Sequence, residues 1–456
     1  MSYKNKINGL LFAISVVAIA APNAYAAVSP EKAVELKSTL TPLGAEKAGN
    51  ADGSIPSWEG GYTTPDPSYK SGGKRRDLFP DDKVMFTITA QNLEKYADKL
   101  SDGTKEMLKK YPDTFRLDVY KTRRTASAPQ WLYDNTFKNA TTAAIVKGTT
   151  GPIPSNTVAG IPFPIPSTGV EVMWNHLLRW RGVSVEMDVF QYLTTADGKH
   201  VLTTHGNASQ EMPYYFKERS ADYDGNYQNF LMESVGPPLR AGEKVLGNEF
   251  FDTKNTMGYA YLTGQRRVRK LPNACCDTPT PATAGVMTYD ELDVFTGRLD
   301  RFDWRLIGKK EMYVPYNSNK INTPDNPEDV LKARHLDPGA VRWELHRVWV
   351  VEATLANGQR HQMSKSRYYL DEDTWTAVLG DRWDSGNRLA KTIWTLPVVM
   401  PDLPGSIAQT SGFYDLNSGA WFVQTLFNGG KAQYKSVDRF RNTQFTQGIL
   451  TGKGVR

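Results

Sequence analysis

Residues 341–355 read Val-Arg-Trp-Glu-Leu-His-Arg-Val-Trp-Val-Val-Glu-Ala-Thr-Leu, and Asn357-Gly358 and a second apolar run, from His361 to Leu370, follow them. Both runs are rich in β-branched and aromatic residues, which strands favour. Asn-Gly is the strongest two-residue signal for a turn between antiparallel strands. This stretch therefore predicts a β-hairpin, and the rest of the C-terminal part repeats its pattern.

The repetition begins at Gly182 and continues to the C-terminal region. Residues 183–195 and 200–209 flank Asp197-Gly198 and predict a second hairpin. One helix is expected to interrupt the strands, at residues 327–335, with proline in its first turn. The other runs that we interpret as strands are 214–216, 228–233, 243–253, 258–271, 298–315, 375–379, 389–399, 413–416 and 420–427.

Residues 27–181 have a mixed helical and loop-like pattern. A capped short helix is predicted after Ser29, and residues 90–111 predict two helices separated at Ser101-Asp102-Gly103. The alternation of residues 115–124 predicts a half-buried strand. The proline-rich residues 151–166 are expected to form an ordered loop or a sheet edge, because proline lacks the N–H that a ladder needs.

So many antiparallel strands with few helices predict a mainly β (α+β) fold, in which one large sheet curls or closes into a barrel. A barrel of that size either encloses a cavity or holds a helix. We therefore expect a β-cup that binds a ligand. The expected organisation is a signal peptide at residues 1–26 and a single large domain over residues 27–456, divided into the mixed part (27–181) and the antiparallel meander (182–456).

The first 26 residues have the pattern of a secretory signal. Two lysines precede the uncharged stretch from Gly9 to Ala21, and Ala24-Tyr25-Ala26 resembles a cleavage site. The apolar stretch is shorter than the ~20 residues that a spanning helix needs. We expect export to the periplasm without a lipid anchor, because no cysteine follows the cleavage point.

Charge and cysteine content exclude some classes of function. Loss of the two signal lysines lowers the formal net charge from +6 to +4, which is too mild to indicate nucleic acid but is compatible with an anionic membrane surface. The only cysteines, Cys275 and Cys276, are adjacent, and this excludes a scaffold held by many disulfides. Whether they pair with each other stays open.

Two segments are candidate binding sites. Residues 170–181 predict a helix that could plug or cover a cavity, or could equally be ordinary core. Residues 265–270 are the densest basic run, and they suit either a solvated edge strand or contact with lipid headgroups or an acidic partner. The candidate cavity residues are Met173, Trp174, Leu177, Leu178 and Trp180, and the candidate headgroup contacts are Arg266, Arg267, Arg269 and Lys270.

Recognisable catalytic and metal-binding motifs are missing from the sequence. It has no H-E-x-x-H, no G-x-S-x-G and no Walker loop. His200 and His205 lie five residues apart on a predicted strand, so they point to opposite faces and do not suit a shared metal. A pair of carboxylates across a cleft, as in glycosidases, stays open as an alternative. We predict no cofactor, no metal and no catalytic residue.

Three segments carry a resemblance to a known family. They are Tyr-Pro-Asp-Thr-Phe-Arg-Leu-Asp-Val-Tyr-Lys-Thr-Arg-Arg (111–124), Gly-Ile-Pro-Phe-Pro-Ile-Pro (160–166) with Asn-His-Leu-Leu-Arg-Trp-Arg-Gly (175–182), and Gly-Gln-Arg-Arg-Val-Arg-Lys-Leu-Pro (264–272). Together they resemble the proteobacterial family DUF1329, grouped with outer-membrane lipoprotein-sorting proteins. The resemblance implies a half-open antiparallel β-barrel closed by helices around an apolar cavity.

The resemblance and the residues together favour a non-enzymatic periplasmic carrier or chaperone for a lipid-like hydrophobic ligand. Relatives often accompany an outer-membrane protein and an efflux-type inner-membrane pump, which implies those partners and transfer between the membranes. Two alternatives stay open: a hydrolase that acts on a lipid or polysaccharide, and a non-catalytic assembly factor of the outer membrane. The ligand, the direction of transfer and the oligomeric state are left undetermined.

Overall fold

The computed structural model describes residues 27–219, 223–271 and 276–452. The predicted signal peptide and Cys275 lie outside these residues. Cys276 is buried. None of the helices in the described ranges is long and apolar enough to cross a membrane.

A 16-stranded sheet dominates the described part of the chain. Two meanders make up most of it: β5 to β10 pair in sequence order, β11 to β17 pair in sequence order, and β17 pairs with β5. Every pairing is antiparallel except a single parallel bridge between β12 and β2. The strands of the two meanders are β5 Ser184–Thr194, β6 His200–Glu211, β7 Asn226–Gly236, β8 Lys244–Phe250, β9 Met257–Leu262, β10 Arg267–Lys270, β11 Phe302–Pro315, β12 Trp343–Leu355, β13 Met363–Asp371, β14 Ala377–Asp384, β15 Leu389–Met400, β16 Gly405–Asp415 and β17 Trp421–Leu426.

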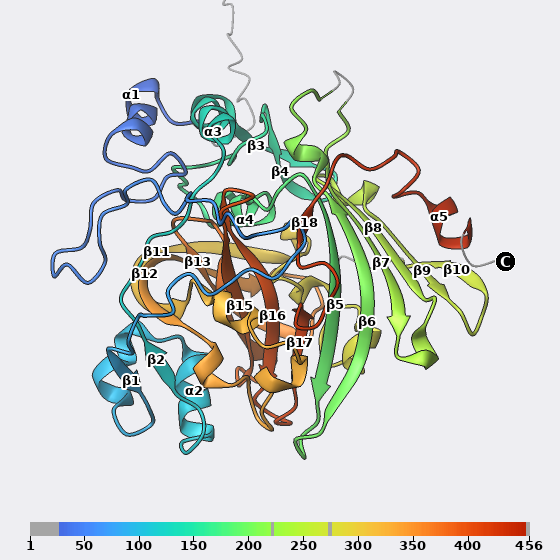
Figure 1. The fold of residues 1–456 in the computed structure, drawn as a ribbon. Helices are drawn as coiled ribbons and strands as arrows, with labels where there is room; N and C mark the ends of the chain where they lie inside the picture. The colour runs from blue at the N-terminus through green and yellow to red at the C-terminus, as the bar shows by residue number, and fades with distance from the viewer. Residues whose placement is uncertain (1–26, 220–222, 272–275, 453–456) are drawn as a thin grey trace, which may run out of the picture.

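The sheet curls without closing. β10 and β11 follow each other in the sequence, yet β10 ends the hydrogen-bonded order while β11 pairs with β12 at its far side, and they lie at the right and left of Figure 1. The chain between them must therefore pass across one face of the sheet, and its described part, residues 276–301, buries Met287, Val294 and Phe295 in the core. We call residues 276–301 the crossover. The prediction of a mainly β fold with a large unclosed antiparallel sheet is confirmed.

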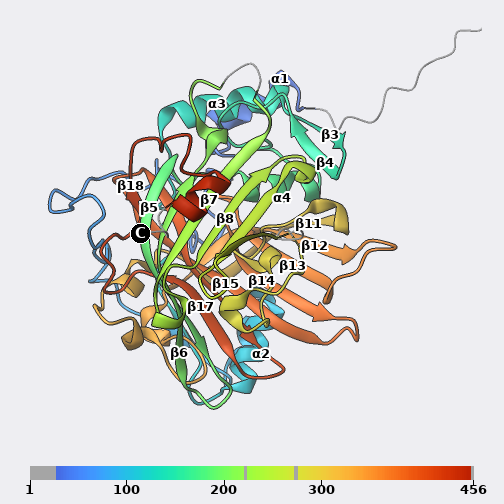
Figure 2. The same ribbon diagram turned by 90° about the vertical axis from the view of Figure 1, so that its right-hand side faces the viewer.

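Helices and short strands cover both faces of the sheet. On the face that the crossover occupies, α4 lies between β8 and β11 (Figure 2), and its residues join the largest apolar cluster. On the other face a second cluster contains Leu100, Met107 and Leu108 of the N-terminal part. The remaining α-helices and strands are α1 Pro30–Ala33, α2 Asp102–Lys110, α3 Gln130–Thr142, α4 Gly169–Leu177, α5 Gln447–Gly452, β1 Phe86–Ile88, β2 Leu117–Val119, β3 Ala144–Gly148, β4 Gly151–Ser155 and β18 Lys435–Ser436. The 3₁₀ helices are η1 Val34–Lys37, η2 Leu93–Lys99, η3 Pro213–Tyr215, η4 Pro238–Arg240, η5 Thr253–Asn255, η6 Pro281–Thr283, η7 Tyr289–Glu291, η8 Leu299–Arg301, η9 Ser318–Asn322, η10 Pro327–Val330 and η11 Pro338–Ala340.

Most predicted elements are present, and four differ from the prediction. The run 258–271, predicted as one strand, is the antiparallel pair β9–β10, and the strand predicted over residues 115–124 is limited to β2. The other two are the helix at residues 327–335 and the strand at residues 214–216. Both predicted hairpins form, as β5–β6 and β12–β13. The helix expected at residues 327–335 is limited to the single turn η10, because Leu331 and Leu336 form a β-bridge that turns the chain back. The strand expected at residues 214–216 is instead η3, where the hydroxyl of Tyr214 donates to the carbonyls of Val158 and Gly160, each at 2.7 Å.

Candidate functional site

The helix α4 forms for local reasons that the sequence contains. Thr168 caps its N-terminus, and the carboxylate of Glu171 accepts the backbone N–H of Thr168 at 3.1 Å, which completes a capping box. Gly169 lets the first turn approach the sheet closely, because a Cβ there would lie 3.2 Å from backbone atoms of Trp304 and Arg305. The capping box and this approach fix α4 against β11.

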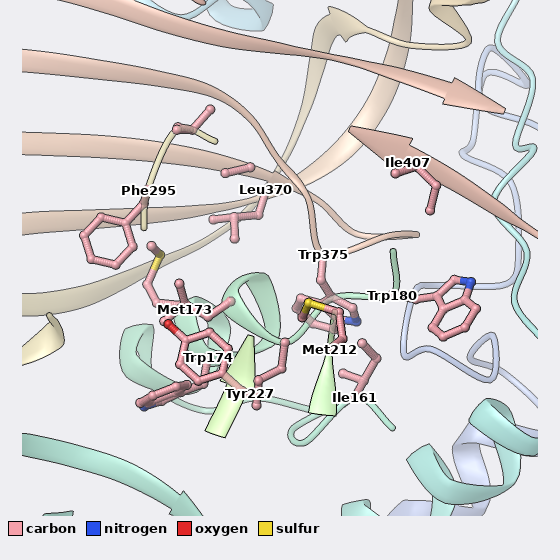
Figure 3. Packing of buried hydrophobic residues seen from close by; sticks show 14 of the residues in the cluster. Ile161, Met173, Trp174, Trp180, Met212, Tyr227, Phe295, Leu370, Trp375 and Ile407 are labelled. Carbon is pink, nitrogen blue, oxygen red and sulfur yellow. The ribbon is translucent and has the colours of Figure 1, made fainter. Parts of the chain in front are cut away.

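All five predicted cavity residues are buried around α4. Met173 and Leu178 are fully buried, and even Trp180 is only 9% exposed. The indole N–H of Trp174 donates to the carbonyl of Pro152 at 3.0 Å, and its ring meets Tyr227 and Phe251 edge-on, with ring centroids 6.1 and 5.7 Å apart. Figure 3 shows Met173 and Trp174 on the helix beneath the strands, near Phe295 and Tyr227. The apolar helix thus occupies the space that the curled sheet surrounds.

Buried arginines fasten the end of α4 to the crossover. Arg179 donates to the carbonyl of His176 at 2.7 Å, and Arg181 donates to that of Leu177 at 2.8 Å. Both guanidinium groups also lie near the carboxylate of Asp293, at 3.2 and 3.4 Å. Burial and the adjacent Arg181 lower the pKa of Arg179 to about 10. These cations satisfy the last carbonyls of the helix, as positively charged side chains do at helix C-termini.

His176 ties the same helix to a strand. The backbone N–H of Ala377 donates to its Nδ1 at 3.0 Å, so the other ring nitrogen carries the proton and donates to the carbonyl of Phe295 at 3.1 Å. Burial, together with Arg179 and Arg181, lowers the pKa of His176 well below its ordinary value. The ring is therefore neutral, and its two hydrogen bonds join α4 to β14 and to the crossover.

An open aromatic pocket of about 410 Å³ lies beyond the C-terminal end of α4. Trp180 meets Trp131 of α3 and Tyr215 of η3 edge-on, with ring centroids 5.5 and 5.2 Å apart. Three exposed charged residues stand at its rim, and the guanidinium of Arg439 lies 3.6 Å from the ring centroid of Phe216. The lining residues are Trp131, Trp180, Val183, Tyr215, Phe216, Lys217, Glu218 and Arg439.

Sequence reasoning found only one of the pocket's aromatic side chains, Trp180. Trp131 lies on α3, which the sequence pattern does not predict, and Tyr215 and Phe216 lie in the segment for which the sequence predicts a strand. The edge-to-face packing of these rings depends on three segments that are distant in sequence. Their spacing along the chain contains no signal that would have brought them together.

The predicted basic residues are exposed at one end of the sheet. Arg267, Arg269 and Lys270 belong to β10, and Arg266 precedes it in the turn from β9, with φ of +49°. Val268 packs on the small cluster with Tyr261 and Phe445, which places it on the opposite face from Arg267 and Arg269. None of these four basic residues lines the aromatic pocket.

A buried polar cluster, which sequence reasoning missed, brings three potential metal ligands together. His346, Asp371 and Asp373 have ligand atoms within 4.8 Å of one another. The guanidinium of Arg124 binds both oxygens of Asp373, at 2.6 and 2.9 Å. The Nε2 of His346 lies 3.1 Å from the carboxylate of Glu344. Because an arginine already neutralises Asp373, we interpret the cluster as a structural ion-pair network.

Asp371 gives this network a dependence on pH. Burial and the neighbouring Asp373 raise the pKa of Asp371 to about 7 from an ordinary value of 3.8. A carboxyl group with a raised pKa stabilises the fold fully below pH 3.8, and this contribution is lost as the pH rises to about 7. One pKa unit corresponds to about 1.4 kcal/mol. Relative to the wild type, Asp371→Asn should therefore gain about 2–3 kcal/mol in free energy of unfolding between pH 5 and pH 8.

Urea unfolding of both proteins across this pH range measures that gain. Asp373→Asn is the matched control, since it removes the partner of Arg124 and should destabilise the fold at both ends of the range. A constant difference between Asp371→Asn and the wild type would show that Asp371 is ionised throughout.

The sequence pattern of DUF1329, a family described as proteins of unknown function, matches residues 87–451. An uncharacterized protein of Pseudomonas aeruginosa is 38% identical over 97% of this chain and 98% of its own length. Two solved structures are each 12% identical to this chain and cover 62% of it. One is a DUF1329 family protein from Desulfovibrio piger, of which 97% is covered, with a TM-score of 0.43. The other is a putative outer membrane lipoprotein-sorting protein domain from Vibrio parahaemolyticus, of which 98% is covered, with a TM-score of 0.44. The family pattern, which covers most of the chain, shows that this chain belongs to the DUF1329 family.

Proposed function

We propose that this protein is a periplasmic carrier or chaperone that binds a lipid-like ligand in the aromatic pocket at the end of α4. The observation that carries the proposal is the position of Trp180, which links the apolar helix inside the curled sheet to an open pocket of about 410 Å³. That volume lies within the range of roughly 300–1,000 Å³ that is typical of small-molecule sites.

The chemistry of the pocket suits an amphiphile with an apolar tail and an anionic head. Trp131, Trp180, Tyr215 and Phe216 offer apolar ring surface, and burial of each methylene group of an acyl chain contributes about 0.8 kcal/mol. The exposed cations Lys217 and Arg439 at the rim can meet a phosphate or carboxylate that remains in water. No catalytic group is needed for such binding.

The predicted signal peptide supports a periplasmic location for the protein. A carrier there would move its ligand between the inner and outer membranes, and we propose an efflux-type pump and an outer-membrane protein as its partners. Met173, Trp174, Leu177 and Leu178 would form the inner wall that a tail reaches if α4 shifts.

The experiment compares ligand binding by the full chain and by Trp131→Ala. Native mass spectrometry after gentle extraction should show a co-purifying amphiphile on the wild type, and calorimetry with lysophosphatidylglycerol should show binding that Trp131→Ala weakens at least tenfold. Trp58→Ala is the matched control, because Trp58 is also half-buried and lines a separate hollow on the other side of α3. Its affinity should equal that of the wild type.

Two results would contradict the proposal. If the wild type neither carries nor binds an amphiphile, the protein is not such a carrier. If lysophosphatidylglycerol is released with a cleaved acyl chain, the protein is a hydrolase and the alternative from the sequence is correct.

A further inference from the structure

Two turns at one end of the sheet expose an apolar and strongly basic surface. The turn from β7 to β8 contains Leu239, which is 90% exposed, and β7 ends beside it with Val235, which is 45% exposed. The turn from β9 to β10 and β10 itself contain the exposed basic residues. We call the following set the tip surface: Val235, Leu239, Arg266, Arg267, Arg269 and Lys270.

The two turns are neighbours in space. A Cβ placed on Gly242, in the first turn, would lie 3.0 Å from the Cγ2 of Thr263, in the second. Both turns project at the lower right of Figure 1, away from α3 and α4. The apolar side chains and the basic residues therefore lie at the same projecting end of the sheet.

The cations of the tip surface are not neutralised by other described residues. None of Arg266, Arg267, Arg269 and Lys270 forms an ion pair within the described part of the chain. The nearby acidic residues already have partners: Glu243 pairs with Arg240 at 2.8 Å, and Glu233 lies 3.6 Å from Lys244. Four positive charges thus face the solvent at the end of the sheet that also exposes Leu239.

We infer that the tip surface docks on an anionic lipid bilayer. A leucine on a projecting turn can enter the headgroup region of a bilayer without a pocket shaped to receive it. Nearby arginines can then contact the lipid phosphates. A protein partner would instead meet a flat or hollowed apolar surface with charges depleted from its centre. Spread positive charge around a small apolar tip fits a deformable, negatively charged lipid surface.

Vesicle co-sedimentation of the full chain tests the inference. Vesicles with one part phosphatidylglycerol and three parts phosphatidylcholine should bind the wild type at low salt, and pure phosphatidylcholine vesicles should bind it far less. Since each cation near an anionic surface contributes about 1 kcal/mol, Arg266→Glu/Arg267→Glu should weaken binding at least ~30-fold. Leu239→Ser should weaken it about tenfold.

Matched variants exclude a general charge effect. Lys199→Glu/Arg388→Glu changes the net charge by the same amount at exposed cations that already have acidic partners, and it should bind vesicles within about threefold of the wild type. Val34→Ser, at a residue 53% exposed elsewhere, should leave binding unchanged. Circular dichroism of each variant checks that it is folded.

The inference is overturned if the wild type does not bind anionic vesicles at low salt, or if the tip variants bind these vesicles as well as their matched controls do. Trp131→Ala separates this proposal from the proposed function, because it should bind vesicles normally while losing its amphiphile. If a tip variant still binds the amphiphile but no longer binds vesicles, this result supports membrane docking independently of amphiphile binding.

Discussion

Replacement of Trp174 by alanine is expected to lower the free energy of unfolding by about 3–5 kcal/mol, as large-to-small changes of buried aromatic residues do. The change removes a ring that is only 3% exposed, its contacts with Tyr227 and Phe251, and the donor to the Pro152 carbonyl. The cavity forms where α4 meets the β7–β8 side of the sheet. Urea unfolding followed by circular dichroism measures the loss.

Two control variants separate the loss of the Trp174 ring from the loss of its hydrogen bond and from a smaller truncation on the same helix. Trp174→Phe keeps most of the ring packing and loses the hydrogen bond, so it should cost about 1–2 kcal/mol. Val170→Ala, at a partly buried position of the same helix, should cost about 1 kcal/mol. If Trp174→Ala costs no more than Val170→Ala, α4 does not hold the interior as the structure indicates.

Replacement of Arg124 by alanine is expected to lower the free energy of unfolding by about 3–5 kcal/mol, because it leaves the buried carboxylate of Asp373 without its counterion. Arg124 and Asp373 each have side chains only 2% exposed, and the carboxylate of Glu372 lies 3.6 Å from the same guanidinium. Arg305→Ala is the matched control. Its guanidinium is 71% exposed and pairs with Glu352, so the loss should stay below about 1 kcal/mol.

A double variant tests whether the cost arises from the pairing. Arg124→Ala/Asp373→Ala removes both charges, so it should be less destabilised than the sum of the two single variants, with a coupling energy of about 1–3 kcal/mol. Additive losses would show that Arg124 stabilises the fold through its other contacts, such as the one with the Lys47 carbonyl at 3.2 Å.

The sequence predicted those elements whose formation depends on local pattern. Asn357-Gly358 lies in the turn between β12 and β13, where Gly358 adopts φ of +78°, a left-handed conformation that glycine favours. Thr168 and Glu171 form the capping box at the start of α4, as their three-residue spacing allows. Such signals involve neighbours in the sequence, so they can be read without knowing the fold.

Apolar periodicity in the sequence does not predict the helix α3. Its buried face includes Thr136 and Asn139, whose side chains bond the segment 158–161 rather than other apolar residues. Because Thr136 and Asn139 share the buried face with Leu132 and Ala140, the apolar periodicity of the helix is interrupted. Tertiary hydrogen bonds, invisible in the sequence, replace the usual signal.

The candidate sites were predictable only in part for the same reason. Met173, Trp174 and Leu177 belong to α4, and Leu178 and Trp180 follow it directly, so the apolar character of this one stretch predicts all five from the sequence. The rest of the aromatic pocket and the Arg124–Asp373 pair join residues from different segments. Nothing in the sequence around Arg124 indicates that it meets a carboxylate 249 positions later.

The join between β17 and β5 has a consequence for how the chain is assembled during synthesis. Hairpins such as β5–β6 and β12–β13 can form as soon as their own residues are available. The pairing of Trp421 with Thr194, however, brings together residues more than 200 positions apart. A nascent chain that ends before Trp421 retains two partly formed meanders, and each of them exposes an unpaired edge where the other should attach. The wall around α4 can be completed only when almost the whole polypeptide has been made, and such long-range pairing makes folding intrinsically slow.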